Sequence, residues 1–247
     1  MKFGIYGGTF NPIHYGHLRT AQEVLERLSL DRVIFIPAGK TPFEKPELIN
    51  ASHRYRMVKD AITDNPAFAI SDLEIKTRGK SFTIDTIMKL RNKYAGSELY
   101  FILGTDAFLD LQHWKQPERI LGLANMVVIL RPGYAFTDLS SSPYLKSISI
   151  KKLKELDRGE KDLFSFDISR EQKGILFKVT GLEISASNIR NLIISGKSVK
   201  YLLPESVESY IIANKLYMQR RIASLTKAEK RPSGRRRRPS IKKPETR

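Results

Sequence analysis

Six short apolar runs, separated by helix-like patterns, constrain the fold of this chain more than any other feature of its sequence. Each run has the length of a β-strand, and most of the segments between them repeat apolar residues at helical spacing. Strands that alternate with helices favour a parallel sheet covered by helices, and thus an α/β fold. The runs are KFGIYG, RVIFIPAG, FAISDLEI, LYFILGTDA, NMVVIL and LFKVTGL.

The segments between the runs predict where the helices lie. Behind the first run, apolar residues from Leu18 to Leu28 recur on one helical face, and charged residues occupy the other. Residues 131–173 interrupt the alternation of strand-like and helix-like segments with a stretch that is Ser-rich and then charged. We interpret this stretch as an insertion or small subdomain with no function assigned. Further helices are predicted over 54–64, 83–94, 106–122, 187–195 and 204–217.

The chain has 247 residues and no cysteine. This length suffices for a large α/β domain. The lack of cysteine excludes a disulfide framework, a thiolate nucleophile and a Cys-type zinc site, and it fits a reducing compartment. No run approaches the ~20 apolar residues of a membrane span, and the first run is too short for a signal peptide. We therefore expect a soluble cytoplasmic protein without membrane contact.

Most of the net charge of +17 lies at the C-terminal end. Residues 219–247 hold twelve Lys or Arg and two Glu, a net charge of +10, together with several prolines and few apolar residues. Such a segment is expected to be a disordered basic tail, which leaves a folded domain over residues 1–218. Its charge predicts weak, salt-sensitive binding of polyanions such as RNA, although an aid to solubility explains it equally well.

The stretch GGTFNPIHYGHL, residues 7–18, directly follows the first apolar run. Glycines after a strand let the backbone turn tightly, and a helix that begins just beyond directs free N–H groups at a ligand, an arrangement that suits phosphate. His14 and His17 lie three residues apart, so on a helix they would share one face. Together these features suggest a nucleotide site. Strand-to-helix turns also contain glycine for structural reasons alone, so this prediction needs support from residues elsewhere in the chain.

Three further strand ends carry suitable side chains. Ligands of open parallel sheets bind outside the carboxyl ends of the strands, so residues that follow different strands meet there. Helix capping by Asp106 or by a serine, and burial of Trp114 in the core, are the structural alternatives. The residues are Lys40 and Lys45 in KTPFEKP, Gly104, Asp106 and Trp114 in GTDAFLDLQHW, and Ser185, Ser187 and Arg190 in ISASNIR.

Taken together, GGTFNPIHYGHL, SFTIDT, GTDAFLDLQHW and ISASNIR resemble bacterial nicotinate-nucleotide adenylyltransferase over about residues 1–217. The resemblance implies a Rossmann-like, doubly wound parallel sheet of the nucleotidyltransferase type. It also implies transfer of AMP from ATP to nicotinate mononucleotide, giving nicotinate adenine dinucleotide and pyrophosphate in NAD biosynthesis. The implied reaction is an in-line attack without a covalent intermediate, with Mg²⁺ held mainly by the ATP phosphates.

The same resemblance implies roles for single residues. His14, His17 and Arg190 are expected to be catalytic through contacts with phosphate, and Thr83 and Trp114 to bind nicotinate mononucleotide, with the pyridine ring stacked on Trp114. The residues expected to bind ATP are Gly7, Gly8, Thr9, Phe10, Gly104, Asp106, Ile184, Ser185, Ser187 and Arg190.

The chain departs from the family pattern at two places. Asn11 stands where the family usually has Asp, and Phe43 and Glu44 replace the histidine and cation of a Pro-Pro-His-Lys loop. Either Lys40 or Lys45 is then expected to supply the lost phosphate contact, or the loop contributes less to the site in this chain. Two alternative functions stay open: a nucleotidyltransferase for nicotinamide mononucleotide or phosphopantetheine, and an RNA-binding protein on the same scaffold.

Overall fold

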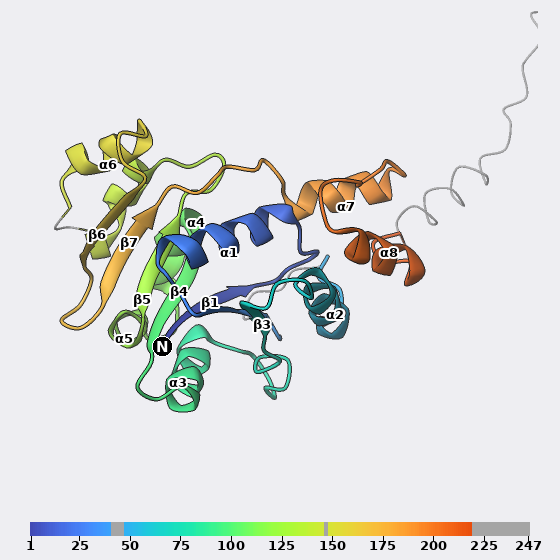
Figure 1. Cartoon of the computed structure of the whole chain (residues 1–247), viewed down its shortest axis with the longest axis horizontal. Helices are drawn as coiled ribbons and strands as arrows, with labels where there is room; N and C mark the ends of the chain where they lie inside the picture. The colour runs from blue at the N-terminus through green and yellow to red at the C-terminus, as the bar shows by residue number, and fades with distance from the viewer. Residues whose placement is uncertain (41–46, 146–147, 219–247) are drawn as a thin grey trace, which may run out of the picture.

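The computed structural model describes residues 1–40, 47–145 and 148–218 of the chain. Within them, seven strands form one sheet, in which every neighbouring pair is parallel except the last, β6 with β7 (Figure 1). The predicted α/β fold with a parallel sheet is confirmed. In spatial order the strands are β3 (Phe68–Ile70), β2 (Arg32–Pro37), β1 (Lys2–Gly8), β4 (Glu98–Gly104), β5 (Asn125–Ile129), β7 (Lys173–Phe177) and β6 (Leu163–Asp167).

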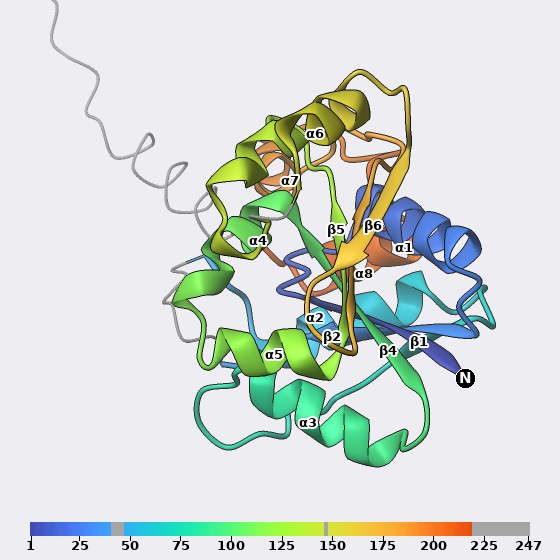
Figure 2. The same cartoon turned by 90° about the vertical axis from the view of Figure 1, so that its left-hand side faces the viewer.

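Helices cover both faces of the sheet (Figures 1 and 2). One face carries α1 (Tyr15–Arg27), α2 (Ala51–Ala61), α7 (Ala186–Ile194) and α8 (Glu205–Ala213). The other carries α3 (Thr83–Lys93), α4 (Thr105–Asp110), α5 (Pro117–Leu123) and α6 (Ile150–Asp157), with the short 3-10 turns η1 (Leu111–His113), η2 (Phe136–Ser141) and η3 (Pro143–Leu145).

Two hydrophobic cores lie on opposite faces of the sheet. Successive side chains of a strand point to opposite faces. In β1, accordingly, Phe3 and Ile5 belong to the core under α3–α6, whereas Tyr6 belongs to the core under α1, α2, α7 and α8. The parallel strands are buried on both sides, which explains why they appear in the sequence as continuous apolar runs rather than as alternating patterns.

The predicted helix over 106–122 is wrong, because the chain breaks there into α4, η1 and α5. Gln116 has a left-handed backbone with φ of 55°, and Pro117 begins α5 at its first position. Proline is favoured at the start of a helix and disfavoured inside one, so it ends the preceding helical stretch. The break leaves Trp114 in an extended conformation between the helical segments.

The segment 131–173 is not separate from the main fold. It forms η2, η3 and α6, and it supplies β6, which pairs antiparallel with β7 at the edge of the sheet. The last predicted strand began at residue 176, whereas β7 spans Lys173–Phe177. Gly174 accounts for part of this difference, because glycine has a low preference for strands and so hides the start of the strand in the sequence. The structure places glycine there because a Cβ would lie 2.2 Å from the Phe166 ring of β6.

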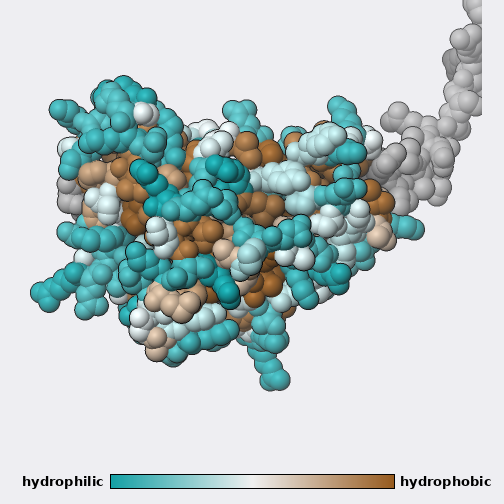
Figure 3. Space-filling view, in the orientation of Figure 1, coloured by the Kyte–Doolittle hydropathy of each residue, from teal (hydrophilic) through white to brown (hydrophobic). Residues whose placement is uncertain are grey.

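Hydrophilic residues cover much of the surface in the orientation of Figure 1, with apolar residues visible between them (Figure 3). Over the described ranges, no helix is long and apolar enough to cross a membrane. The predicted tail, residues 219–247, lies outside the described residues, and the domain boundary at 218 stays a prediction.

Candidate active site

A cleft of about 700 Å³ opens at the carboxyl edge of the sheet. It lies where β1 and β4 are neighbours and where the order of the following strands runs in opposite directions, toward β2 and β3 on one side and toward β5 and β7 on the other. Such a switch point is where open α/β sheets bind ligands. Predicted site residues that line the cleft are Gly7, Gly8, Thr9, Phe10, His14, His17, Gly104, Asp106, Trp114, Ser185, Ser187 and Arg190.

The turn between β1 and α1 forms the floor of the cleft. Gly8 lies against the ring of Phe10, and a Cβ on Gly8 would come within 3.0 Å of that ring. Phe10 itself has a left-handed φ of 45°, and its ring is buried in the first core. The buried ring therefore anchors the turn, while the glycine backbone beside it stays open to the cleft.

Arg54 in α2 holds this turn from behind. Its side chain is fully buried and donates to the carbonyl oxygens of Thr9 (2.7 Å), Ile49 (3.1 Å), Ala38 and Gly39. The C=O and N–H of a trans peptide point in opposite directions, so the bond to the Thr9 carbonyl turns the following N–H away from Arg54. The sequence analysis did not identify this residue, because an arginine in a helix is expected to lie on the surface.

The two histidines meet at the N-terminus of α1. His14 is the N-cap residue and His17 the third residue of the helix, so they meet through the cap rather than on one helical face. Their ring centroids lie 3.8 Å apart, and the His14 backbone N–H donates to His17 Nδ1 at 3.3 Å. Because Nδ1 of His17 accepts this bond, the neutral imidazole carries its proton on Nε2.

Burial controls the charge of both rings. It lowers the pKa of His14 from 6.5 to about 4, with a smaller contribution from the positive charge of Arg131. It also lowers the pKa of His17 well below the ordinary value, helped by His14 and Arg131. Nδ1 of His14 is buried without a hydrogen-bond partner among the described residues. Without an anion both rings are neutral, and an anionic group placed against them would raise both pKa values.

Gly104, at the end of β4, brings Asp106 next to Arg131. A Cβ on Gly104 would lie 2.3 Å from Cδ of Arg131 and 2.4 Å from Oδ1 of Asp106, so a larger residue there would displace these two side chains. The guanidinium and the carboxylate lie 3.9 Å apart at closest approach. Sequence analysis missed Arg131 as a site residue, although it follows β5 at the same sheet edge and was therefore open to the same reasoning.

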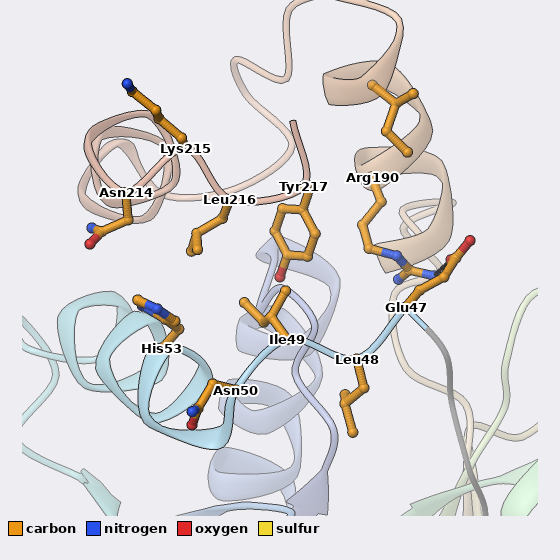
Figure 4. Close-up of a pocket in the computed structure, with 11 residues that line it drawn as sticks. Glu47, Leu48, Ile49, Asn50, His53, Arg190, Asn214, Lys215, Leu216 and Tyr217 are labelled. Carbon is orange, nitrogen blue, oxygen red and sulfur yellow. Dashed lines mark hydrogen bonds and ion pairs between the residues drawn. The ribbon is translucent and has the colours of Figure 1, made fainter. Parts of the chain in front are cut away.

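Arg190 reaches the cleft from α7. Ser185 caps this helix, because its hydroxyl accepts from the Asn188 backbone N–H at 3.1 Å. The structural alternative given for this serine in the sequence analysis, helix capping, is therefore observed. The Arg190 guanidinium lies 3.3 Å from the Ser187 hydroxyl and 2.8 Å from the Glu47 carboxylate. Figure 4 shows Arg190 beside Glu47 at the border of a second cavity of about 480 Å³.

Trp114 lines the other end of the cleft. It is partly buried, its ring meets Phe101 edge-to-face at 6.3 Å between centroids, and its Nε1–H donates to Asp110 at 3.2 Å. One face of an indole held in this way can stack on a flat ring.

Three described residues among those predicted, Lys40, Thr83 and Ile184, are not among those that line the cleft. Thr83 begins α3, and Lys40 pairs with Lys80 in an isolated bridge beside it. Ile184 lines a smaller pocket on the other side of the two histidines. Lys45 lies outside the described residues.

Comparison with known proteins identifies the family of the chain. The cytidylyltransferase-like family model matches residues 5–192. A Syntrophotalea carbinolica protein described as "Probable nicotinate-nucleotide adenylyltransferase" is 42% identical over 225 residues, which cover 88% of this chain and 97% of the relative. A Geotalea uraniireducens protein with the same description is 42% identical over 221 residues, which cover 88% and 98%.

Solved structures extend the likeness to the fold. Plasmodium falciparum nicotinic acid mononucleotide adenylyltransferase complexed with NaAD matches with a TM-score of 0.65 at 18% identity, over 87% of this chain and 97% of that one. At 18% identity this match establishes a common fold and nothing about function. The family assignment comes from the family model and the curated relatives, and on these matches the chain belongs to the nicotinate-nucleotide adenylyltransferases of the cytidylyltransferase-like family.

Proposed function

We propose that this protein transfers AMP from ATP to nicotinate mononucleotide, forming nicotinate adenine dinucleotide and pyrophosphate. The observation that carries the proposal is one cleft that is lined by a pair of adjoining imidazoles, an arginine and a partly buried tryptophan. Cations and N–H donors suit the triphosphate, and an indole suits a pyridine ring. The family assignment supports the same reaction.

On the ATP side, the turn around Gly8 and Thr9 offers backbone N–H groups to the phosphates, and the rings of His14 and His17 lie above the start of α1. His17 donates from Nε2, because its Nδ1 is occupied by the His14 backbone. Arg190 approaches from α7 and holds the β and γ phosphates, which leave as pyrophosphate. Asp106 contacts the ribose, and the pocket that includes Ile184 receives the adenine.

The chemistry requires no covalent nucleophile, and the chain has no cysteine. A 5′-phosphate oxygen of the acceptor attacks the α-phosphorus of ATP in line, and the bond to the pyrophosphate oxygen breaks. Catalysis then depends on alignment of the two substrates and on donors directed at the charge that develops on the phosphate oxygens. Nδ1 of His14 has no hydrogen-bond partner among the described residues, so His14 is the ring that can gain a proton once phosphate lies against it, and this adds positive charge where the reaction needs it.

On the acceptor side, the pyridine ring stacks on Trp114, and Thr83 approaches from the start of α3. Lys40, in the loop that follows β2, or Lys45 contacts the acceptor phosphate in place of the missing loop histidine. Mg²⁺ supplies charge neutralisation on the phosphates. Among the described residues no group of three or more His, Asp or Glu side chains could hold a metal ion. Magnesium keeps waters and phosphate ligands, so the phosphates of ATP can hold it without a dedicated set of protein ligands.

One assay tests the proposal. Release of pyrophosphate from ATP is measured with nicotinate mononucleotide, nicotinamide mononucleotide or phosphopantetheine offered separately. The expected result is turnover with nicotinate mononucleotide well above that with the other two. A preference for nicotinamide mononucleotide or phosphopantetheine would assign a different acceptor, and no release with any of them would favour the RNA-binding alternative.

A further inference from the structure

Arg190 belongs to a closed network with Asn11 and Glu47. Its Nη1–H donates to the Asn11 carbonyl oxygen at 2.9 Å, and its Nη2–H donates to the Glu47 carboxylate at 2.8 Å. The side-chain amide of Asn11 in turn donates to the Glu47 carbonyl oxygen at 3.0 Å. Three segments far apart in the sequence are thereby held around one guanidinium, whose side chain is only 14% exposed.

Tyr217 completes this network from the C-terminal side. Its hydroxyl donates to Oδ1 of Asn11 at 2.9 Å across 206 positions of sequence. The Tyr217 ring lies between the chain leading into α2 and α7, close to Glu47 and Arg190 (Figure 4). Tyr217 has a left-handed φ of 66°, a backbone conformation that costs energy for a bulky residue and persists where the surroundings impose it.

The chemistry of the two side chains explains their pairing. Asn11 is 6% exposed, so both of its side-chain polar atoms need partners. An amide can accept from Tyr217 and donate to Glu47 at the same time, whereas an ionised carboxylate can only accept. Burial raises the pKa of Tyr217, so its hydroxyl stays protonated and remains a donor at neutral pH.

We propose that Tyr217 is a positioning residue for Arg190. Acting through Asn11, it fixes the guanidinium in the orientation that receives the pyrophosphate portion of ATP, so the segment that follows α8 supports the site. The inference rests on the proposed function only in assigning Arg190 to these phosphates.

The test is a Tyr217→Phe substitution in the full chain, with inorganic pyrophosphate as the probe in calorimetric titration. Loss of the hydroxyl should weaken pyrophosphate binding about five- to tenfold and raise the KM for ATP similarly, while the KM for nicotinate mononucleotide is unchanged. Tyr210→Phe is the matched control, because it removes a hydroxyl bonded to His53 at 2.9 Å that makes no contact with Arg190. The control should leave pyrophosphate affinity unchanged.

A second variant separates positioning from loss of stability. Asn11→Ala should weaken pyrophosphate binding on its own, and Tyr217→Phe should add nothing further in that background, because contacting residues are not additive when one acts through the other. Unchanged pyrophosphate affinity in Tyr217→Phe, equal effects in the Tyr210 control, or full additivity with Asn11→Ala would each overturn the proposal. Pyrophosphate binding needs no acceptor, so the comparison still decides the inference if nicotinate mononucleotide is not the substrate.

Discussion

Replacing His17 by two different residues separates its structural role from its chemical role. The ring makes two contributions: Nδ1 accepts from the His14 backbone at the start of α1, and the ring, with its proton on Nε2, lines the cleft. His17→Ala removes both. His17→Asn keeps a side-chain oxygen near the place of Nδ1, and so retains the helix cap, but it has no group that reaches the place of Nε2.

The two contributions have different magnitudes. Loss of one preorganised donor to developing charge costs ~3 kcal/mol, which lowers kcat by a factor of about 10² to 10³. Loss of the cap contact costs ~1 kcal/mol of the free energy of unfolding, or about 2 to 4 °C in Tm for a chain of this size. We expect both variants to lose kcat to a similar extent, and only His17→Ala to lose thermal stability.

Pyrophosphate release and differential scanning calorimetry measure the two effects on the same samples. If His17→Asn retained more than a tenth of the wild-type kcat, the imidazole would not be a donor to the transition state. If His17→Asn melted as early as His17→Ala, the contact with the His14 backbone would not stabilise the helix.

Four other perturbations have defined outcomes. Between pH 6.5 and about 4 the unfolded chain binds a proton at His14 more readily than the folded one, so acidification from pH 7 to pH 5 should lower the free energy of unfolding by ~1 to 2 kcal/mol through His14, in addition to a loss through His17, whose pKa is lowered in the same direction. Calorimetry of His14→Asn should show a loss that is smaller by the His14 contribution. Trp114→Ala should weaken binding of nicotinate mononucleotide by ~1 to 3 kcal/mol and leave ATP binding unchanged in calorimetric titration; equal losses would place the ring in the core instead. Arg54→Met leaves buried carbonyls without donors and should lower Tm by about 6 to 12 °C, whereas Arg56→Met, at an exposed position of the same helix, should change it by less than about 2 °C. Truncation after Met218 should preserve kcat, KM and Tm but reduce retention of RNA at low salt in filter binding; equal retention by both chains would remove the tail from polyanion binding.

The parallel sheet and most of the cleft could be predicted because both depend on local signals. Buried parallel strands appear as apolar runs, and the rule that strand ends share one edge brings together residues as distant as Gly8, Asp106 and Arg190. The same rule would have identified Arg131. That residue was overlooked because it opens a segment whose charged sequence resembles a loop, although the segment ends in the edge strand β6.

Other features depend on contacts that no local pattern records. The position of Arg54 inside the protein follows from four carbonyl groups, three of which belong to loops that lie 15 to 45 positions away in sequence. The meeting of Asn11 with Tyr217 depends on where α8 ends relative to the first turn of the chain. Even the histidine pair was predicted from helical spacing, whereas one member caps the helix and orients the other.

The two hydrophobic cores divide the cleft between them. Phe10, Ile13 and Ile189, next to the histidines and to Arg190, belong to the core on one face of the sheet. Phe108 and Leu111, in the segment that leads to Trp114, belong to the core on the other face. Close packing transmits a change of side-chain volume to its neighbours, but the strands stand between the two cores. Over evolutionary time, the segment that leads to Trp114 can therefore be repacked while the packing behind the two histidines and Arg190 is inherited unaltered.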